Sequence, residues 1–228
     1  MQIQPKAILK DCPLCRHMTD VQLDALLSTA GGRVQAYEKG AYIFSEGDKP
    51  EQLYILLEGK IGIARDALSG RRILMTQLEK GGELFGEVYL FLGSGRYDVH
   101  AEALESSAVL ELPGRILGAA CFEDSGLSGI LQQNLLAIFA RKAYALNRRV
   151  RVLGAATLRE KIAHYLTQRQ DDQGRIRERL SREEMAAYMG AARPSLSREL
   201  GCMQEEGILR MEGRRIEILD QTALEQYL

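Results

Sequence analysis

The sequence predicts an α+β protein with three parts: an N-terminal β-roll of the jelly-roll type (a double-stranded β-helix), a long helix and a C-terminal winged helix-turn-helix. Three observations predict this fold: short apolar runs separated by glycines over 31–112, an uninterrupted helical period over 126–152, and two short helical segments joined at Gly190 and followed by alternating strands. We expect the β-roll domain to span 1–125, the long helix and a hinge 126–153, and the winged domain 154–228.

The β-roll is predicted from five short runs that are β-branched or alternate apolar with polar residues, each bounded by turn residues. These runs lie at 42–44, 53–57, 60–64, 72–75 and 108–112. The preceding segment, 14–30, is expected to form a small helix that is capped by Thr19 and carries Leu23, Leu26 and Leu27 on one face.

The long helix is predicted from apolar residues that recur every three or four positions without an interrupting proline. This pattern favours pairing with a second copy of the helix, with Leu135 and Ile138 in the seam, and therefore a homodimer. The alternative is a helix buried against its own β-roll, which explains the length of the pattern less well. The apolar positions are Ile130, Leu131, Leu135, Ile138, Ala145, Leu146, Val152 and Leu153.

Two short helices follow, and their spacing is typical of a helix-turn-helix. Ser181 with Glu184 three residues later predicts a capping box, and Gly190 can take the left-handed turn between the helices. The second helix, expected over 192–204, places Leu196, Leu200 and Met203 inward. Its remaining positions point elsewhere: Arg193, Ser195, Ser197, Arg198 and Glu199.

The outward positions suit the major groove of DNA. Arg193 and Arg198 are candidate guanine readers, because a guanidinium group can form two hydrogen bonds with a guanine edge. Pro194 is tolerated in the first helical turn and offers a thymine methyl an apolar contact. The expected DNA-binding set is completed by Ser181, Ser195 and Ser197. The alternative is an ordinary helical hairpin with a solvated charged face.

A β-hairpin after the second helix predicts the wing. Runs at 208–211 and 216–219 flank a turn that carries Gly213, Arg214 and Arg215. Arginines in such a turn meet phosphates beside the groove, so Arg214 and Arg215 are expected to position the protein and to read no base.

Composition is ordinary for a soluble globular protein. The 228 residues are 46% hydrophobic and 27% charged, with a net charge of −1. A neutral total does not exclude DNA binding, because the distribution of charge matters more than its sum. No apolar run reaches the length of a membrane span, and the start lacks a signal-peptide core, so we expect a cytoplasmic protein without a membrane partner. No nucleophile–base–acid set and no phosphate-cradling glycine loop is visible, which argues against an enzyme.

The cysteines do not form a disulfide framework of the secreted type. Cys12 and Cys15, with His17 nearby, could hold a metal or act in redox chemistry, but a closed zinc site needs four ligands and no second Cys-x-x-Cys follows. The alternative is a loop that carries thiols. We predict no metal site.

The order of these parts resembles the catabolite activator and fumarate-nitrate regulator (CRP/FNR) superfamily of bacterial transcription factors over nearly the whole chain. The resemblance implies a homodimer on a two-fold symmetric operator, a small-molecule effector in the β-roll and RNA polymerase as a partner. It rests on Gly40, on Gly47 and Asp48, on Leu53 and Tyr54, on Glu58 and Gly59, on the stretch 81–87, and on Arg193, Ser195 and Arg198.

The effector site implied by this resemblance departs from the cyclic-AMP-binding members. There a Gly-Glu pair, matched by Gly86 and Glu87, contacts the ribose, and an Arg-Ser pair about ten residues later grips the cyclic phosphate. Counting without gaps, that pair falls on Tyr97 and Asp98, with Arg96 one residue early. A carboxylate beside a buried phosphate is unfavourable, so we expect an effector other than cyclic AMP. The adenine-contacting positions fall on or near Leu146 and Asn147.

Other interpretations stay open at this point. A register shifted by one residue would put Arg96 at the phosphate and restore cyclic AMP. The N-terminal cysteines are too few for the iron–sulfur centre of the fumarate-nitrate branch, and Cys121 lies beyond the expected strand; a haem would need one of three histidines, without a motif. A different class of function is a cyclic-nucleotide-type sensor that acts through protein partners.

Overall fold

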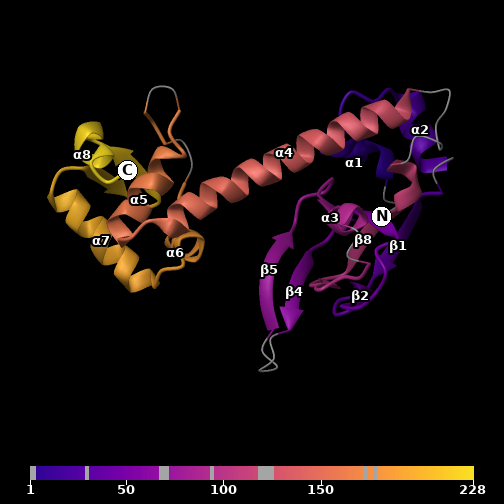
Figure 1. Ribbon diagram of the computed structural model, residues 1–228, viewed down its shortest axis with the longest axis horizontal. Coiled ribbons are helices and arrows are strands. Elements are labelled where there is room, and N and C mark those ends of the chain that lie inside the picture. Colours follow the sequence, from indigo (N-terminus) through magenta and orange to yellow (C-terminus); the bar gives the residue numbers. More distant parts are fainter. Residues whose placement is uncertain are drawn as a thin grey trace. The chain divides into compact units, whose positions relative to one another are not determined.

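A computed structural model describes residues 4–28, 31–66, 72–92, 95–117, 126–171, 174–176 and 179–228. The chain forms two compact units, Met1–Phe139 and Ala140–Leu228. Figure 1 shows the elements of both. The expected three-part division stays a prediction, because its first boundary falls in 118–125, outside the described residues, as does Cys121. No helix in the described part of the chain is both long and apolar enough to cross a membrane.

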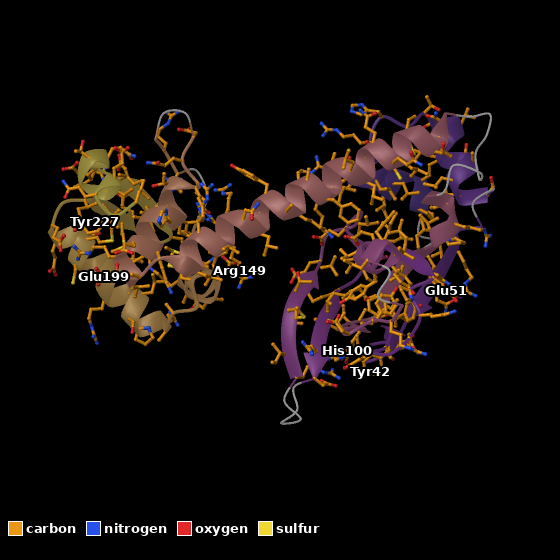
Figure 2. All side chains as sticks on the ribbon, in the orientation of Figure 1. Tyr42, Glu51, His100, Arg149, Glu199 and Tyr227 are labelled. Carbon is orange, nitrogen blue, oxygen red and sulfur yellow. The ribbon has the colours of Figure 1, made fainter. Side chains whose placement is uncertain are left out.

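Two four-stranded antiparallel sheets build the first unit, and they confirm the predicted β-roll. One sheet has the order β1 (Arg33–Tyr37), β8 (Ser107–Pro113), β3 (Gln52–Glu58) and β6 (Leu84–Phe85). The other has the order β2 (Tyr42–Phe44), β7 (His100–Ala103), β4 (Ile61–Asp66) and β5 (Arg72–Leu78). Tyr42 and His100, on the paired strands β2 and β7, meet edge to face with ring centroids 5.3 Å apart (Figure 2).

Strand β3 shows why this unit needs two cores. Five consecutive residues from Leu53 to Leu57 are buried, because both faces of the strand are covered. Side chains alternate across a strand, so Leu53, Ile55 and Leu57 enter a core shared with the helices, whereas Tyr54 and Leu56 enter the aromatic interior of the roll.

Helices cover the first of these cores. They are α1 (Pro5–Asp11), the 3-10 turn η1 (Pro13–Cys15) and α2 (Asp20–Ser28), with α3 (Glu87–Leu92) and the 3-10 turn η2 (Gly114–Leu117) farther along. The helix expected over 14–30 therefore begins only at Asp20, after Thr19, whose hydroxyl accepts a hydrogen bond of 3.3 Å from Gln22 N. Leu23 and Leu26 are buried as expected.

Helix α4 (Leu127–Gly154) carries two different apolar faces. Leu127, Leu131, Leu135 and Ile138 are buried in the core that contains α1 and η1. Asn134 on the same face donates to the carbonyl oxygens of Leu14 (2.8 Å) and Arg16 (2.7 Å). The prediction that Leu135 and Ile138 form an intermolecular seam is therefore wrong: both pack within their own unit.

The second unit is the predicted winged helix-turn-helix. Its elements are the C-terminal part of α4, α5 (Leu158–Thr167), α6 (Arg182–Met189), α7 (Arg193–Glu205), β9 (Leu209–Glu212), β10 (Arg215–Ile218) and α8 (Gln221–Glu225). Gly190 ends α6 with φ 62°, the left-handed conformation that the turn requires. One core contains apolar side chains of both α6 and α7: Met185, Met189, Leu196, Leu200 and Met203. Because α7 turns its apolar side chains into this core, its opposite face is directed outward.

Candidate nucleic-acid interface and ligand pocket

The outer face of α7 brings together five of the residues expected to bind DNA. The helix starts after Ala192 without a side-chain cap, and Pro194 occupies its first turn. Arg193 makes an exposed ion pair with Glu183 at 2.9 Å, whereas Arg198 has no ion pair with any described residue. The exposed set is Arg193, Pro194, Ser195, Ser197 and Arg198.

Ser181 acts first as a helix cap. Its hydroxyl accepts from Glu184 N at 3.5 Å and donates to the Glu183 carboxylate at 3.0 Å. The reciprocal bond of a capping box, to the Glu184 side chain, is not formed within the described residues. The side chain of Ser181 is only half-buried, so a DNA contact there stays a prediction.

Glu183 links α6 with α7 and the wing. Its own backbone N–H, the Ser181 hydroxyl and the charges of Arg193 and Arg214 hold the pKa of Glu183 below its ordinary value. The wing is fastened to the same region, since Leu180 N donates to the Arg214 carbonyl oxygen at 2.8 Å. Arg193 and Arg214, which come from separate elements, therefore lie on one side of this unit.

The wing itself has the expected geometry. Strands β9 and β10 pair antiparallel, with Arg215 opposite Glu212, and Gly213 in the turn has φ 61°. Arg214 lies in the turn and Arg215 is the first residue of β10. Both side chains are exposed, so a phosphate backbone can reach them.

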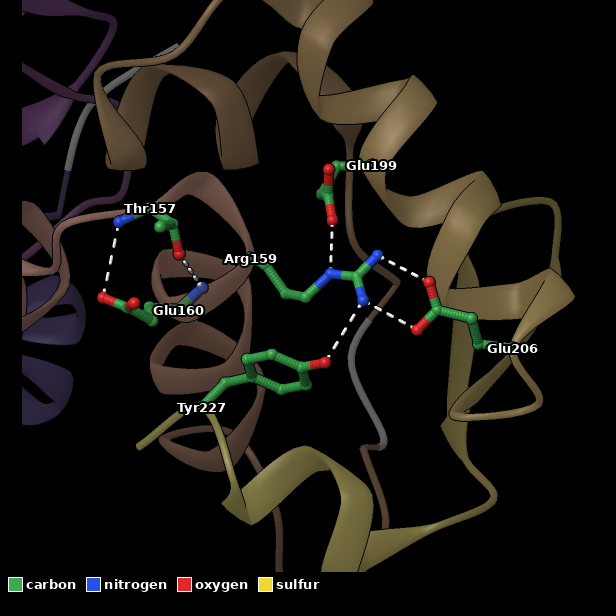
Figure 3. A network of polar contacts seen from close by, with 6 residues as sticks. All are labelled: Thr157, Arg159, Glu160, Glu199, Glu206 and Tyr227. Carbon is green, nitrogen blue, oxygen red and sulfur yellow. Dashed lines mark hydrogen bonds and ion pairs between the residues drawn. The ribbon is translucent and has the colours of Figure 1, made fainter.

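A polar network that sequence reasoning missed holds the inner side of α7 (Figure 3). Arg159, at the start of α5, donates to both carboxylate oxygens of Glu206, to Glu199 and to the Tyr227 hydroxyl. These partners raise the pKa of Arg159, with Glu206 contributing most. Glu199, expected among the positions of the helix that do not point inward, is paired with Arg159.

The start of α5 is fixed by a capping box that was also not predicted. Thr157 Oγ1 accepts from Glu160 N at 3.2 Å, and the Glu160 carboxylate accepts from Thr157 N at 3.3 Å (Figure 3). The Thr-x-x-Glu pattern at this position is the signal that could have revealed it.

In the first unit, Gly86 lies against the aromatic interior of the roll. With φ 79°, a Cβ at this position would stand 2.8 Å from Tyr54 Cδ2, so only glycine fits. Glu87 follows as the first residue of α3 and is 1% exposed.

Tyr97 fills the space next to Gly86. Its side chain is 2% exposed, is stacked on Phe44 with centroids 3.9 Å apart and meets the edge of Tyr89. Burial raises the pKa of Tyr97, and raises that of Tyr54 to about 12. The Tyr97 hydroxyl lies close to that of Tyr54 but has no hydrogen bond of good geometry with any described residue. A buried donor in this state is suited to a polar ligand atom.

Arg96 and Asp98 flank Tyr97, and both are exposed. Arg96 donates to the Gly47 carbonyl oxygen at 2.6 Å, and Asp98 accepts from the Tyr89 hydroxyl. Burial, followed by the bond to Asp98, raises the pKa of Tyr89 to about 12. Leu146 and Asn147 lie on the part of α4 that belongs to the second unit, where both are exposed.

Cys12 and Cys15 are buried in the core of the first unit. A hydrogen bond between the two thiols lowers the pKa of Cys12 and raises that of Cys15. Across the described ranges, no three His, Cys, Asp or Glu residues come together as metal ligands.

Comparisons with known proteins match both units. Residues 34–124 match the cyclic nucleotide-binding domain family, and 160–227 the Crp-like helix-turn-helix domain family. The "Cyclic AMP receptor protein" of Thermus thermophilus is 28% identical over 223 residues, covering 96% of this chain and 97% of that protein. "Transcriptional activator protein FnrA" of Stutzerimonas stutzeri is 27% identical, covering 98% and 93%. The solved "Thermus thermophilus Catabolite Activator Protein" has 27% identity and a TM-score of 0.53, covering 94% and 97%.

Proposed function

The chain belongs to the CRP/FNR family of DNA-binding transcription regulators, and we propose that it acts as an effector-responsive homodimer on a two-fold symmetric operator. It carries an effector-binding domain of the cyclic nucleotide-binding type and a helix-turn-helix domain. The observation that carries the proposal is the outer face of α7, where Arg193 and Arg198 are exposed and Glu183 lies close to both Arg193 and the wing residue Arg214.

DNA contact follows from the chemistry of these positions. In a helix-turn-helix the second helix enters the major groove, where Arg193 and Arg198 would read guanines. Arg214 and Arg215 would meet phosphates, which carry no sequence information. Binding of Arg193 to a base edge would break its ion pair with Glu183. The loss of free energy would be small, because this ion pair is exposed.

The homodimer is supported by a second apolar face of α4. Leu136, Phe139, Ala143, Leu146, Val150 and Leu153 alternate steps of three and four residues, which is the a/d pattern of a two-stranded coiled coil. Leu136 is 70%, Leu146 63% and Val150 57% exposed. Large apolar side chains in this register need a partner with the same register, and an identical helix from a second copy supplies it.

The effector proposed for the roll is a small molecule other than cyclic AMP, although the Thermus thermophilus relative is named "Cyclic AMP receptor protein". At the positions where a cyclic phosphate needs a cation and a hydroxyl, this chain has the buried ring of Tyr97 and the carboxylate of Asp98. Gly86, Glu87, Arg96 and Tyr97 would line the site. The positions that the resemblance assigns to the adenine contact, Leu146 and Asn147, stay a prediction.

Effector binding would act by shifting a population. A ligand that binds one state of the dimer more tightly biases the hinge after Val152 and with it the spacing of the two recognition helices. Family membership also supports RNA polymerase as the protein partner.

An electrophoretic shift assay with promoter DNA tests the proposal directly. We expect a shifted band that disappears when unlabelled DNA of the same sequence is added as competitor. If the protein shifts no promoter fragment, either alone or with small molecules extracted from cells, the result would instead favour a sensor that acts through protein partners.

A further inference from the structure

A cleft of about 580 Å³ lies within the second unit, lined by the C-terminal part of α4, the residues that follow α5, and α6. Arg148 and Arg149 line it from α4, and Arg169 from the segment after α5; Figure 2 labels Arg149. The other polar lining groups are Gln168, Gln170 and Tyr188, and none of the described lining residues is acidic. The cleft is therefore strongly basic.

Aromatic rings hold these arginines in place. The guanidinium carbon of Arg149 lies 5.6 Å from the Tyr188 ring centroid, and that of Arg169 lies 5.1 Å from the same ring. Arg169 also lies 3.6 Å from the ring centroid of Tyr165. A ring orients a guanidinium group but does not neutralise it, so the positive charge of Arg149 is positioned and retained.

Four other arginines of the second unit are held differently. Carboxylates pair with Arg159, Arg175, Arg193 and Arg210. By contrast, neither Arg148 nor Arg149 pairs with a carboxylate from any part of the chain that the structure describes. Positive charges gathered at one cleft repel one another and so destabilise the folded second unit. An anion bound among them would remove that repulsion.

Gln168 adds a directional group. Its amide donates to the Arg148 carbonyl oxygen at 3.0 Å, which fixes the side chain. Its carbonyl oxygen Oε1 is covered and lacks a donor among the described residues. A ligand hydroxyl beside the anionic group would supply that donor.

We propose that this cleft binds a small phosphate-bearing molecule with a hydroxyl group, such as a sugar phosphate or a nucleotide. Guanidinium forks match phosphate oxygens in geometry and charge. The volume lies within the range of about 300 to 1,000 Å³ that is usual for small-ligand sites. None of the lining residues of this cleft belongs to the outer face of α7, and only Leu146 is also among the positions predicted for the effector site.

Calorimetric titration of the full-length protein without DNA, at constant ionic strength, tests the site with inorganic phosphate, pyrophosphate and ribose 5-phosphate. Saturable binding of pyrophosphate at one site per chain is expected. Arg149→Gln should weaken it about tenfold or more, and Arg149→Lys, which keeps the charge but loses the fork, by less. Arg141→Gln on the same helix, exposed and outside the cleft, is the matched control and should change binding less than about twofold.

Gln168 has its own readout. Ribose 5-phosphate should bind more tightly than inorganic phosphate, and Gln168→Leu should abolish that preference while pyrophosphate binding remains. Equal binding of the two ligands by the wild-type protein would overturn the assignment of Gln168 Oε1.

Three results would overturn the site as a whole. One is the absence of saturable pyrophosphate binding. Another is pyrophosphate binding that survives Arg149→Gln but is lost in Arg198→Ala, which would place the anion on the recognition helix. The third is a loss of DNA affinity in ligand-free Arg149→Gln as large as in Arg198→Ala, without pyrophosphate binding, which would make the cleft a DNA-backbone contact.

Discussion

Arg159 and Glu206 face each other through two parallel hydrogen bonds, Nη1 to Oε2 at 2.7 Å and Nη2 to Oε1 at 2.8 Å. The pair joins the start of α5 to the end of α7 across 47 residues of sequence. Paired forks of this kind fix direction as well as distance. We therefore expect the network to help set the orientation of α7 from its inner side.

Arg159→Lys should lower both stability and DNA affinity, because an ammonium group cannot form the fork with Glu206 while also bonding Glu199. We expect a loss of stability of roughly 1 kcal/mol, the upper range for a partly exposed pair. Thermal unfolding measures the first effect, and a binding titration of operator DNA at a temperature where the variant is fully folded measures the second. Arg175→Lys, at an exposed pair with Asp171, is the control. DNA affinity equal to wild type in Arg159→Lys would show that the fork does not orient α7.

Substitutions at two adjacent leucines of α4 should distinguish an effect on folding from an effect on dimerisation. Leu135 is 4% exposed in the core of the first unit, and Leu136 is 70% exposed on the second apolar face of α4. Leu136→Lys should leave a folded monomer, because the charge enters only the coiled-coil seam. Leu135→Lys should instead lower the stability of the chain by about 3 kcal/mol or more, as a charge buried without a partner does.

Sedimentation velocity and thermal unfolding distinguish the two leucine variants. Leu146→Lys, on the same face as Leu136, should also dissociate the dimer. A wild-type protein that sediments as a monomer at micromolar concentration would contradict the coiled-coil proposal, and so would a dimeric Leu136→Lys variant.

The helix-turn-helix could be predicted from sequence because each of its signals is local. Ser181 stands at the start of α6, Gly190 supplies the left-handed turn, and Leu196 and Leu200 follow the helical period. The β-roll was predicted only in part, because β1, β6 and β7 are not among the predicted runs. Strand β6 has only two residues, Leu84 and Phe85, too few to produce a pattern.

The role of each face of α4 could not be predicted, because periodicity shows that a side chain is apolar but not what covers it. Ile138 and Leu146 belong to the same helical pattern, yet the first is buried in its own unit and the second is exposed. The Arg159 network is equally invisible in sequence, since its members are brought together only by the tertiary fold. The effector positions follow only from the family resemblance, and the burial of Tyr97 depends on packing against Phe44, which the sequence pattern does not show.

Arg193→Ala and Arg198→Ala should each cost about 1 to 3 kcal/mol of specific DNA binding and relax base preference, because each removes a guanidinium group from the groove face of α7. Arg215→Ala should weaken binding to all sequences alike and reduce the salt dependence, since a phosphate contact carries no base information. Binding titrations against an operator library at two salt concentrations measure both effects. Unchanged affinity and preference in both α7 variants would remove α7 from the groove.

Cyclic AMP should bind weakly or not at all. Tyr97 lies beside Gly86 with its ring stacked on Phe44, and it offers one neutral hydroxyl and no positive charge at the place where a cyclic phosphate needs a cation. Asp98 would place a carboxylate near the same phosphate, and two anions close together in a partly desolvated site repel each other. Calorimetry with cyclic AMP and cyclic GMP should therefore show no saturable binding at micromolar concentration. Arg96 is the one guanidinium close to Tyr97 in sequence, held at the Gly47 carbonyl oxygen. Micromolar binding of cyclic AMP that disappears in Arg96→Ala would mean that Arg96 takes the phosphate, and the ordinary cyclic-nucleotide site, shifted by one residue, would replace the effector assignment made for this roll.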